Sequence, residues 1–241
     1  MSITELVRGM KDMRPAVLPV VMVGIVAFAA YVFLELAEEI GEDEFGAMDR
    51  ALLLAFRNPA DVSDPLGPPW LEEAVAQITA LGGYPILVVL VATVAGYLLV
   101  ARRYGPALFV VLSTGLGTLA SQLLKLFYDR PRPDVVDHLV TIHTASFPSG
   151  HATMSAIVYL TLAALIVRLV EQTRVRIYVM SVAILITAAV GLSRIYLGVH
   201  WPSDVAAGWA LGAAWASLAW LVVSALRAWR HRQKLPDDQP A

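Results

Sequence analysis

Three short stretches of the chain share residue types suited to handling a phosphate group. They are Lys125 to Arg132-Pro133, Pro-Ser-Gly-His at residues 148–151, and Ser193-Arg194 to His200 and Asp204. Lys and Arg donate charge-assisted hydrogen bonds to phosphate oxygens, and the planar guanidinium of Arg matches two oxygens at once. Imidazole titrates near neutral pH and serves as a nucleophile or as a general acid and base. The combination predicts phosphoryl transfer.

The second and third stretches also indicate how these groups are positioned. Ser149 and Gly150 precede an apolar run and are predicted to open a helix, where free backbone N–H groups and the positive dipole end favour an anion. Gly150 lacks a Cβ and lets the backbone approach a ligand closely. Asp204 follows His200 by four residues, so in a helix both would share one face. The carboxylate could then hold the second ring N–H.

Taken singly, each stretch also has an interpretation without chemistry. Ser-Gly-His is a common triplet, His-x-x-x-Asp at a helix start is typical of a cap, and Arg-Pro-Arg-Pro is typical of a stiff loop beside a membrane. Their conjunction, in this order, predicts one site. Arg130 lies inside the first stretch, and the sequence leaves open whether it contacts a substrate. His138 and His143 are typical of solvated loop histidines, although a role in substrate choice stays open.

The composition indicates that the elements carrying these stretches lie in a lipid bilayer. Hydrophobic residues make up 58% and charged residues 16% of the 241 residues, with a mean hydropathy of +0.65. Soluble domains have roughly 45–50% apolar and about 25% charged residues. This balance excludes a disordered chain and a nucleic-acid binder with a basic surface. The absence of cysteine excludes disulfides, thiol nucleophiles, Cys-ligated zinc and iron–sulfur clusters.

Six apolar segments approach the roughly 20 residues that a spanning helix needs. They are Ala16–Leu36, Tyr84–Ala101, Pro106–Leu124, Ala152–Val167, Val175–Leu192 and Val205–Leu226. The sequence therefore predicts an all-α polytopic membrane protein. Between the first two spans, apolar residues at helical spacing in residues 45–56 predict an interfacial helix, which either lines a lipid entry route or rests on the protein. The first span resembles a signal peptide, but its apolar run is longer than usual, which favours a retained helix.

The basic residues predict the orientation of the six spans. Lys and Arg of short loops prefer the cytoplasmic side. With the N-terminus inside, the cytoplasmic segments hold 12 basic and 5 acidic residues, whereas the outer segments hold 6 basic and 15 acidic residues. The three stretches then fall together at the outer ends of the spans. Lys125, Arg132 and Arg194 would be cations kept in an otherwise acidic face to bind an anion.

These stretches resemble the signature of the type 2 phosphatidic acid phosphatase (PAP2) superfamily of membrane lipid phosphatases. That signature reads Lys-x6-Arg-Pro, Pro-Ser-Gly-His and Ser-Arg-x5-His-x3-Asp, and every defining position is present between residues 125 and 204. The resemblance implies a six-helix PAP2/haloperoxidase-like bundle. Residues 37–83 and the C-terminal tail carry no family signal. The last residues, 236–241, are expected to be disordered.

The resemblance also implies a role for each matching residue. His200 would be the nucleophile that takes the phosphoryl group, and Asp204 would orient it. His151 would protonate the leaving oxygen and then activate water. The phosphate oxygens would be held by Lys125, Arg132, Ser149, Gly150 and Arg194. No metal or other cofactor is implied, since three cations and a helix N-terminus can neutralise a phosphate.

The implied reaction is hydrolysis of a phosphomonoester or diphosphate on a membrane lipid at the extracytoplasmic face. Undecaprenyl diphosphate, phosphatidylglycerophosphate, phosphatidic acid and lipid A are the candidate substrates, and the motifs do not rank them. A phosphotransferase using an alcohol acceptor is an alternative. A transporter or scaffold is disfavoured, because the spans lack the charges typical of an ion path. The oligomeric state stays open, and nucleic acid is not an expected partner.

These inferences predict three segments in a bacterial inner membrane. Residues 1–15 would be a cytoplasmic N-terminus, residues 16–226 the membrane phosphatase domain, and residues 227–241 a basic cytoplasmic tail. Within the domain, segments 125–151 and 193–204 would form the active site on the periplasmic side.

Overall fold

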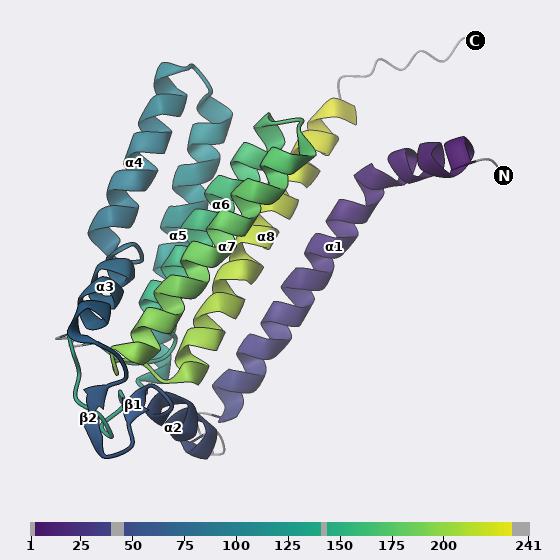
Figure 1. Cartoon of the computed structure of the whole chain (residues 1–241). Helices are drawn as coiled ribbons and strands as arrows, with labels where there is room; N and C mark the ends of the chain where they lie inside the picture. The colour runs from purple at the N-terminus through teal and green to yellow at the C-terminus, as the bar shows by residue number, and fades with distance from the viewer. Residues whose placement is uncertain (1–2, 40–45, 141–143, 233–241) are drawn as a thin grey trace, which may run out of the picture.

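The computed structural model describes residues 3–39, 46–140 and 144–232 of the chain. Within these ranges the chain forms a bundle of helices with a small two-stranded ribbon at one end (Figure 1). The elements are α1 (Ile3–Glu39), α2 (Gly46–Leu54), β1 (Arg57–Asn58), β2 (Asp61–Pro65), α3 (Pro69–Ala80), α4 (Tyr84–Val100), α5 (Tyr104–Tyr128), α6 (Gly150–Leu169), α7 (Thr173–Tyr196) and α8 (Pro202–Arg232).

Five of these helices are long and apolar enough to cross a membrane by themselves, namely α1, α5, α6, α7 and α8. The sixth predicted span corresponds to α4, which has 17 residues and meets α3 at a 45° bend. Counting the bent pair as one span gives six. The predicted all-α membrane bundle is confirmed, and each of the six apolar segments lies mostly within a helix.

Between residues 57 and 80 the structure contains elements that the sequence analysis did not predict. Arg57–Asn58 pairs antiparallel with Asp61–Pro65, so the fold contains one small ribbon that an all-α prediction misses. Helix α3 follows, and Pro69 and Glu72 in its first turn suit a helix N-terminus. Its 12 residues are too few to be found in a search for apolar spans of about 20 residues.

Helix α6 is the most buried of the spanning helices and lies between α5, α7 and α8. Small residues let α8 approach it closely. A Cβ added at Gly208 would lie 2.9 Å from the Ser149 carbonyl oxygen, and one at Gly212 would lie 2.3 Å from the Ala156 Cβ. This Gly-x-x-x-Gly therefore allows the close packing of α8 against α6. Gly117 of α5 packs in the same way against α6. A Cβ added at Gly115, two residues earlier in α5, would have no neighbour within 4 Å.

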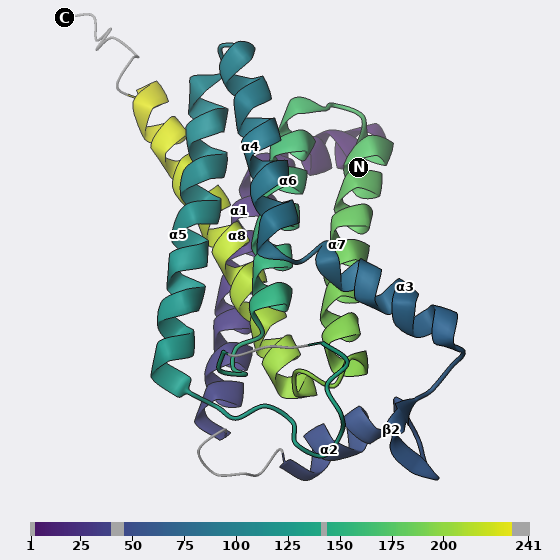
Figure 2. The same ribbon diagram turned by 90° about the vertical axis from the view of Figure 1, so that its left-hand side faces the viewer.

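The connections at one end of the bundle gather the polar segments together. The C-terminal ends of α1, α5 and α7 and the N-terminal ends of α6 and α8 lie at this end (Figures 1 and 2). Helix α2, the ribbon and the long α5–α6 connection cover it. The three phosphate-type stretches lie at the ends of these helices, so the fold brings them to one place.

Candidate active site

His200 lies in the turn between α7 and α8 and is almost completely buried, with 2% of its surface exposed. Helix α8 begins at Pro202, so His200 precedes the helix and does not share a helix face with Asp204. The two side chains nevertheless meet, with His200 Nδ1 3.5 Å from Asp204 Oδ2. The turn requires Gly198, whose φ is +74°.

Arg132 approaches the other side of the same imidazole ring. Its Nη1 atom lies 3.2 Å from Nε2 of His200. A guanidinium can only donate hydrogen bonds, so Nε2 must present its lone pair and Nδ1 must carry the proton. The same guanidinium donates to the carbonyl oxygens of Thr144, Ala145 and Val199. This arrangement fixes the tautomer in which Nε2 is the free nucleophilic atom.

The electrostatic environment keeps His200 neutral. Burial lowers the pKa of His200 to about 3, although the hydrogen bond and the charge of Asp204 oppose that shift. At neutral pH the ring is therefore uncharged and its Nε2 lone pair is available. Burial also lowers the pKa of Arg132, and the carboxylate of Asp204 counteracts part of this effect. The guanidinium of Arg132 keeps its positive charge, because arginine is not deprotonated in proteins.

Ser146 is a site residue that the sequence analysis missed. Its hydroxyl donates to Asp204 Oδ2 at 2.5 Å and lies 3.3 Å from His200 Nδ1. The backbone N–H of Trp201 donates to the same carboxylate oxygen at 2.9 Å. Ser146 stands two residues before the Pro-Ser-Gly-His stretch, and a lone serine beside a motif gives no sequence signal of its own. Only the fold shows that it bridges the Asp204–His200 pair.

Lys125 and the N-terminus of α6 form a second part of the site. Lys125 lies in the last turn of α5, is buried, and donates from Nζ to the Ala145 carbonyl at 2.8 Å. A Cβ at Gly150 would lie 3.2 Å from the Lys125 Cε, so the lysine stem passes directly over this glycine. Ser149 is the N-cap residue of α6, as predicted, and its N–H donates to the Asp204 carbonyl.

Arg194 enters from the last turn of α7 and is 2% exposed. Its Nη1 donates to Thr79 Oγ1 of α3 at 3.0 Å, so the unpredicted helix α3 supports a predicted site residue. Within the described part of the chain, the Arg194 Nε and the Ser149 Oγ are buried without a hydrogen-bond partner. Buried donors of this kind are costly unless a ligand accepts from them, which suits an anion site.

His151 occupies the first turn of α6, next to the N-terminal N–H groups of that helix. The charges of Arg194, Lys125 and Arg132 all act on its imidazole. Arg132 and Arg194 act on His200 as well. The two histidines and the three cations that the sequence analysis singled out are therefore close enough for their charges to interact.

Two further predictions concern residues outside the motif positions. His138 lies in the α5–α6 connection and its Nε2 donates to the Pro133 carbonyl, so it is a loop residue bonded to the backbone. His143 lies outside the described residues. The sequence analysis left open whether Arg130 contacts a substrate. In the structure its guanidinium contacts Asp204 and Asp49.

Comparison with known proteins gives the same picture. The model of the PAP2 superfamily matches residues 106–228. The chain belongs to the PAP2 superfamily. It is 35% identical over 147 residues to phosphatidylglycerophosphatase B of Bacillus subtilis, which covers 60% of this chain and 71% of that protein.

Two solved structures support the PAP2 assignment. One is the transmembrane PAP2 type phosphatidylglycerolphosphate phosphatase from Bacillus subtilis, with a TM-score of 0.73 and 28% identity over 89% of this chain and 98% of that one. The other is Aquifex aeolicus LpxE, with a TM-score of 0.56 and 25% identity over 72% of this chain and 94% of that one. The protein is an integral membrane phosphatase of the PAP2 type.

Proposed function

We propose that the protein hydrolyses a phosphomonoester or diphosphate on a membrane lipid through a phosphohistidine intermediate on His200. One observation carries this proposal. His200 is buried and neutral, its Nδ1 faces Asp204, and its Nε2 faces the guanidinium of Arg132. An imidazole held in this tautomer directs its lone pair toward the position where a cation attracts a phosphate.

The reaction has two steps. In the first, Nε2 of His200 attacks phosphorus, the bond from phosphorus to the leaving oxygen breaks, and His151 donates a proton to that oxygen. Asp204 stabilises the positive charge that develops on the ring. In the second step His151 removes a proton from water, the water oxygen attacks phosphorus, and the N–P bond breaks. Inorganic phosphate then leaves. The lipid product has already left in the first step, as an alcohol from a phosphomonoester or as a lipid monophosphate from a diphosphate.

The chain supplies enough donors to neutralise the transferred group without a metal ion. Lys125, Arg132 and Arg194 contribute three positive charges, and the unpartnered Ser149 Oγ and Arg194 Nε provide further donors. The N–H groups of the first turn of α6, from Gly150, complete the set. These fixed donors stabilise negative charge in the transition state without reorganisation.

The substrate class follows from the fold and from the names of the relatives. A site at the ends of membrane-spanning helices suits a phosphate attached to a lipid. The similarity to phosphatidylglycerophosphatase B makes phosphatidylglycerophosphate the first substrate to test. Undecaprenyl diphosphate, phosphatidic acid and lipid A complete the panel of lipid substrates to be tested.

The purified protein is expected to release inorganic phosphate from at least one lipid of this panel, with the same initial rate in the presence of EDTA. The measurement is phosphate release in detergent micelles, with lipid analysis of the products. A new phospholipid instead of inorganic phosphate would indicate phosphotransfer to an alcohol. Loss of activity in EDTA would contradict the metal-independent mechanism.

We also propose that the N-terminus (residues 1–15) and the C-terminal tail (residues 227–241) lie in the cytoplasm. The membrane domain, residues 16–226, then presents the site to the periplasm of a bacterial inner membrane. The acidic character of the segments at the site end supports this placement, because positive loops favour the cytoplasm.

A single introduced cysteine can test this orientation, because the natural chain has none. An Asp137→Cys variant, exposed in the α5–α6 connection, is expected to react with a membrane-impermeant maleimide in intact spheroplasts. An Arg103→Cys variant, exposed at the opposite end between α4 and α5, should react only after lysis. The reverse pattern would overturn the proposed topology.

A further inference from the structure

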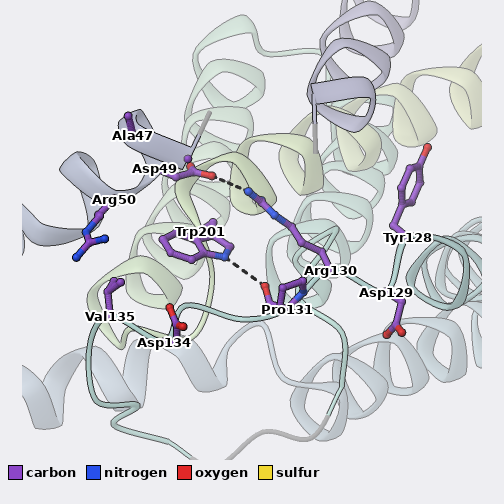
Figure 3. A pocket seen from close by; sticks show the side chains of 11 residues that line it. Ala47, Asp49, Arg50, Tyr128, Asp129, Arg130, Pro131, Asp134, Val135 and Trp201 are labelled. Carbon is purple, nitrogen blue, oxygen red and sulfur yellow. Dashed lines mark hydrogen bonds and ion pairs between the residues drawn. The ribbon is translucent and has the colours of Figure 1, made fainter. Parts of the chain in front are cut away.

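Two residues outside the three motifs are connected directly to the Asp204 carboxylate. Arg130 Nη1 lies 2.7 Å from Asp204 Oδ1. Its Nη2 lies 3.0 Å from Asp49 Oδ2, a contact that Figure 3 shows. The side chain of Arg130 is 12% exposed, and those of Asp49 and Asp204 are 1% and 0% exposed. One guanidinium therefore bridges two buried carboxylates, one from α2 and one from α8.

Asp49 also holds the first turn of α8, which carries Asp204. Its Oδ1 accepts the backbone N–H of Ser203 at 2.8 Å, and its Oδ2 accepts the Ser203 hydroxyl at 2.5 Å. The first N–H groups of a helix have no partner within the helix, and a carboxylate satisfies them as a cap. Helix α2 thus provides an N-terminal cap for α8 from a distant part of the sequence.

These contacts determine which way the Asp204 carboxylate faces. Arg130 occupies Oδ1, while Oδ2 accepts from Ser146 and Trp201 and faces Nδ1 of His200. Two buried carboxylates without a counter-charge would be strongly unfavourable, and Arg130 supplies that charge through short, charge-assisted hydrogen bonds. The ring of Trp201, with its centroid 5.8 Å from the guanidinium carbon, packs on a further side of Arg130.

We infer that Arg130 and Asp49 are positioning residues for the nucleophile. Arg130 fixes the Asp204 carboxylate so that Oδ2 holds the Nδ1–H of His200, and Asp49 fixes both Arg130 and the first turn of α8. This inference rests on the proposed role of His200. It assigns no substrate contact to Arg130, and it gives α2 a function in setting the geometry of the site.

An Arg130→Gln variant is expected to lower kcat by about 10²-fold, the upper range for losing a residue that orients a reacting group. The loss should be equal for a lipid phosphate and for p-nitrophenyl phosphate, which has no lipid headgroup, and KM should change by less than about threefold. The Asp49→Asn variant should lose about 10-fold. Because both residues act on the same carboxylate, the double variant should lose less than the product of the two single losses.

Arg50→Gln is the matched control, because Arg50 is exposed and lines the same cavity as Arg130 (Figure 3). It should behave like the natural chain. Arg130 lines that cavity, whose volume of about 750 Å³ is large enough to hold a guanidinium ion. Free guanidinium is therefore expected to restore part of the activity of Arg130→Ala, which a purely structural loss would not allow. Size-exclusion chromatography verifies folding, and Asp49→Asn decides the question if the Arg130 variants do not fold.

Three results would overturn this inference while leaving the proposed function intact. One is an Arg130→Gln variant that matches Arg50→Gln. A second is a rise in KM for the lipid alone, with unchanged hydrolysis of p-nitrophenyl phosphate, which would make Arg130 a headgroup contact. The third is a wild-type rate in Asp49→Asn. An active His200→Ala variant would instead overturn the proposed function itself.

Discussion

Replacing His200 by alanine is expected to lower kcat by at least about 10³-fold, since the covalent route disappears with the nucleophile. Arg132 and Asp204 contact His200 on opposite nitrogens of its ring. Neither neighbour can replace it, because a guanidinium is no nucleophile and Asp204 is completely buried. The measurement is the initial rate of phosphate release from the best lipid substrate.

The intermediate provides a second, independent measurement. Phosphohistidine is stable to alkali and labile to acid, so an alkaline quench of the natural protein with radiolabelled substrate should retain label on the protein. His200→Ala should retain none. His138→Ala is the matched control, since His138 lies in the α5–α6 connection and bonds only to a backbone carbonyl among its described contacts. A His200→Ala variant with near-normal turnover would show that another group attacks phosphorus.

The spanning helices and the position of the three motifs could be predicted from the sequence, because both depend on local patterns. In lipid, an apolar run of about 20 residues is stable as a helix, because a helix satisfies all of its own backbone hydrogen bonds. Polar residues between such runs must then lie at the helix ends. Lys125, Ser149, Gly150 and Arg194 occupy the helix ends where the sequence placed them. His200 lies in the turn before α8, where Gly198 takes a positive φ and the helix begins at Pro202.

The supporting residues could not be predicted, because their role depends on contacts between segments far apart in the chain. Asp49 is 154 positions from Ser203, and Thr79 is 115 positions from Arg194. Each is an ordinary polar residue in a stretch without family signal, and only the tertiary fold gives it a partner. Residues 46–80, which the sequence left without a function, therefore contribute contacts that hold the catalytic machinery in place.

Replacing His151 by alanine is expected to separate the two chemical steps. General acid and base catalysis contributes about 10²–10⁴-fold, so turnover of a lipid phosphate should fall within that range. A lipid alkoxide needs a proton to leave, whereas p-nitrophenolate leaves without one. With p-nitrophenyl phosphate, the attack by His200 should therefore survive, while hydrolysis of the phosphohistidine, which needs a base to activate water, should be slow.

The expected signature of His151→Ala is a burst of about one p-nitrophenol per active site, followed by slow turnover and accumulation of alkali-stable phosphoenzyme. The natural protein should show a smaller burst, since His151 also accelerates the second step. The position of His151 supports this assignment, because it lies in the first turn of α6, directly after Ser149 and Gly150. Equal losses on both substrates, with no phosphoenzyme, would instead assign His151 to phosphate binding alone and leave the proton transfers to another group.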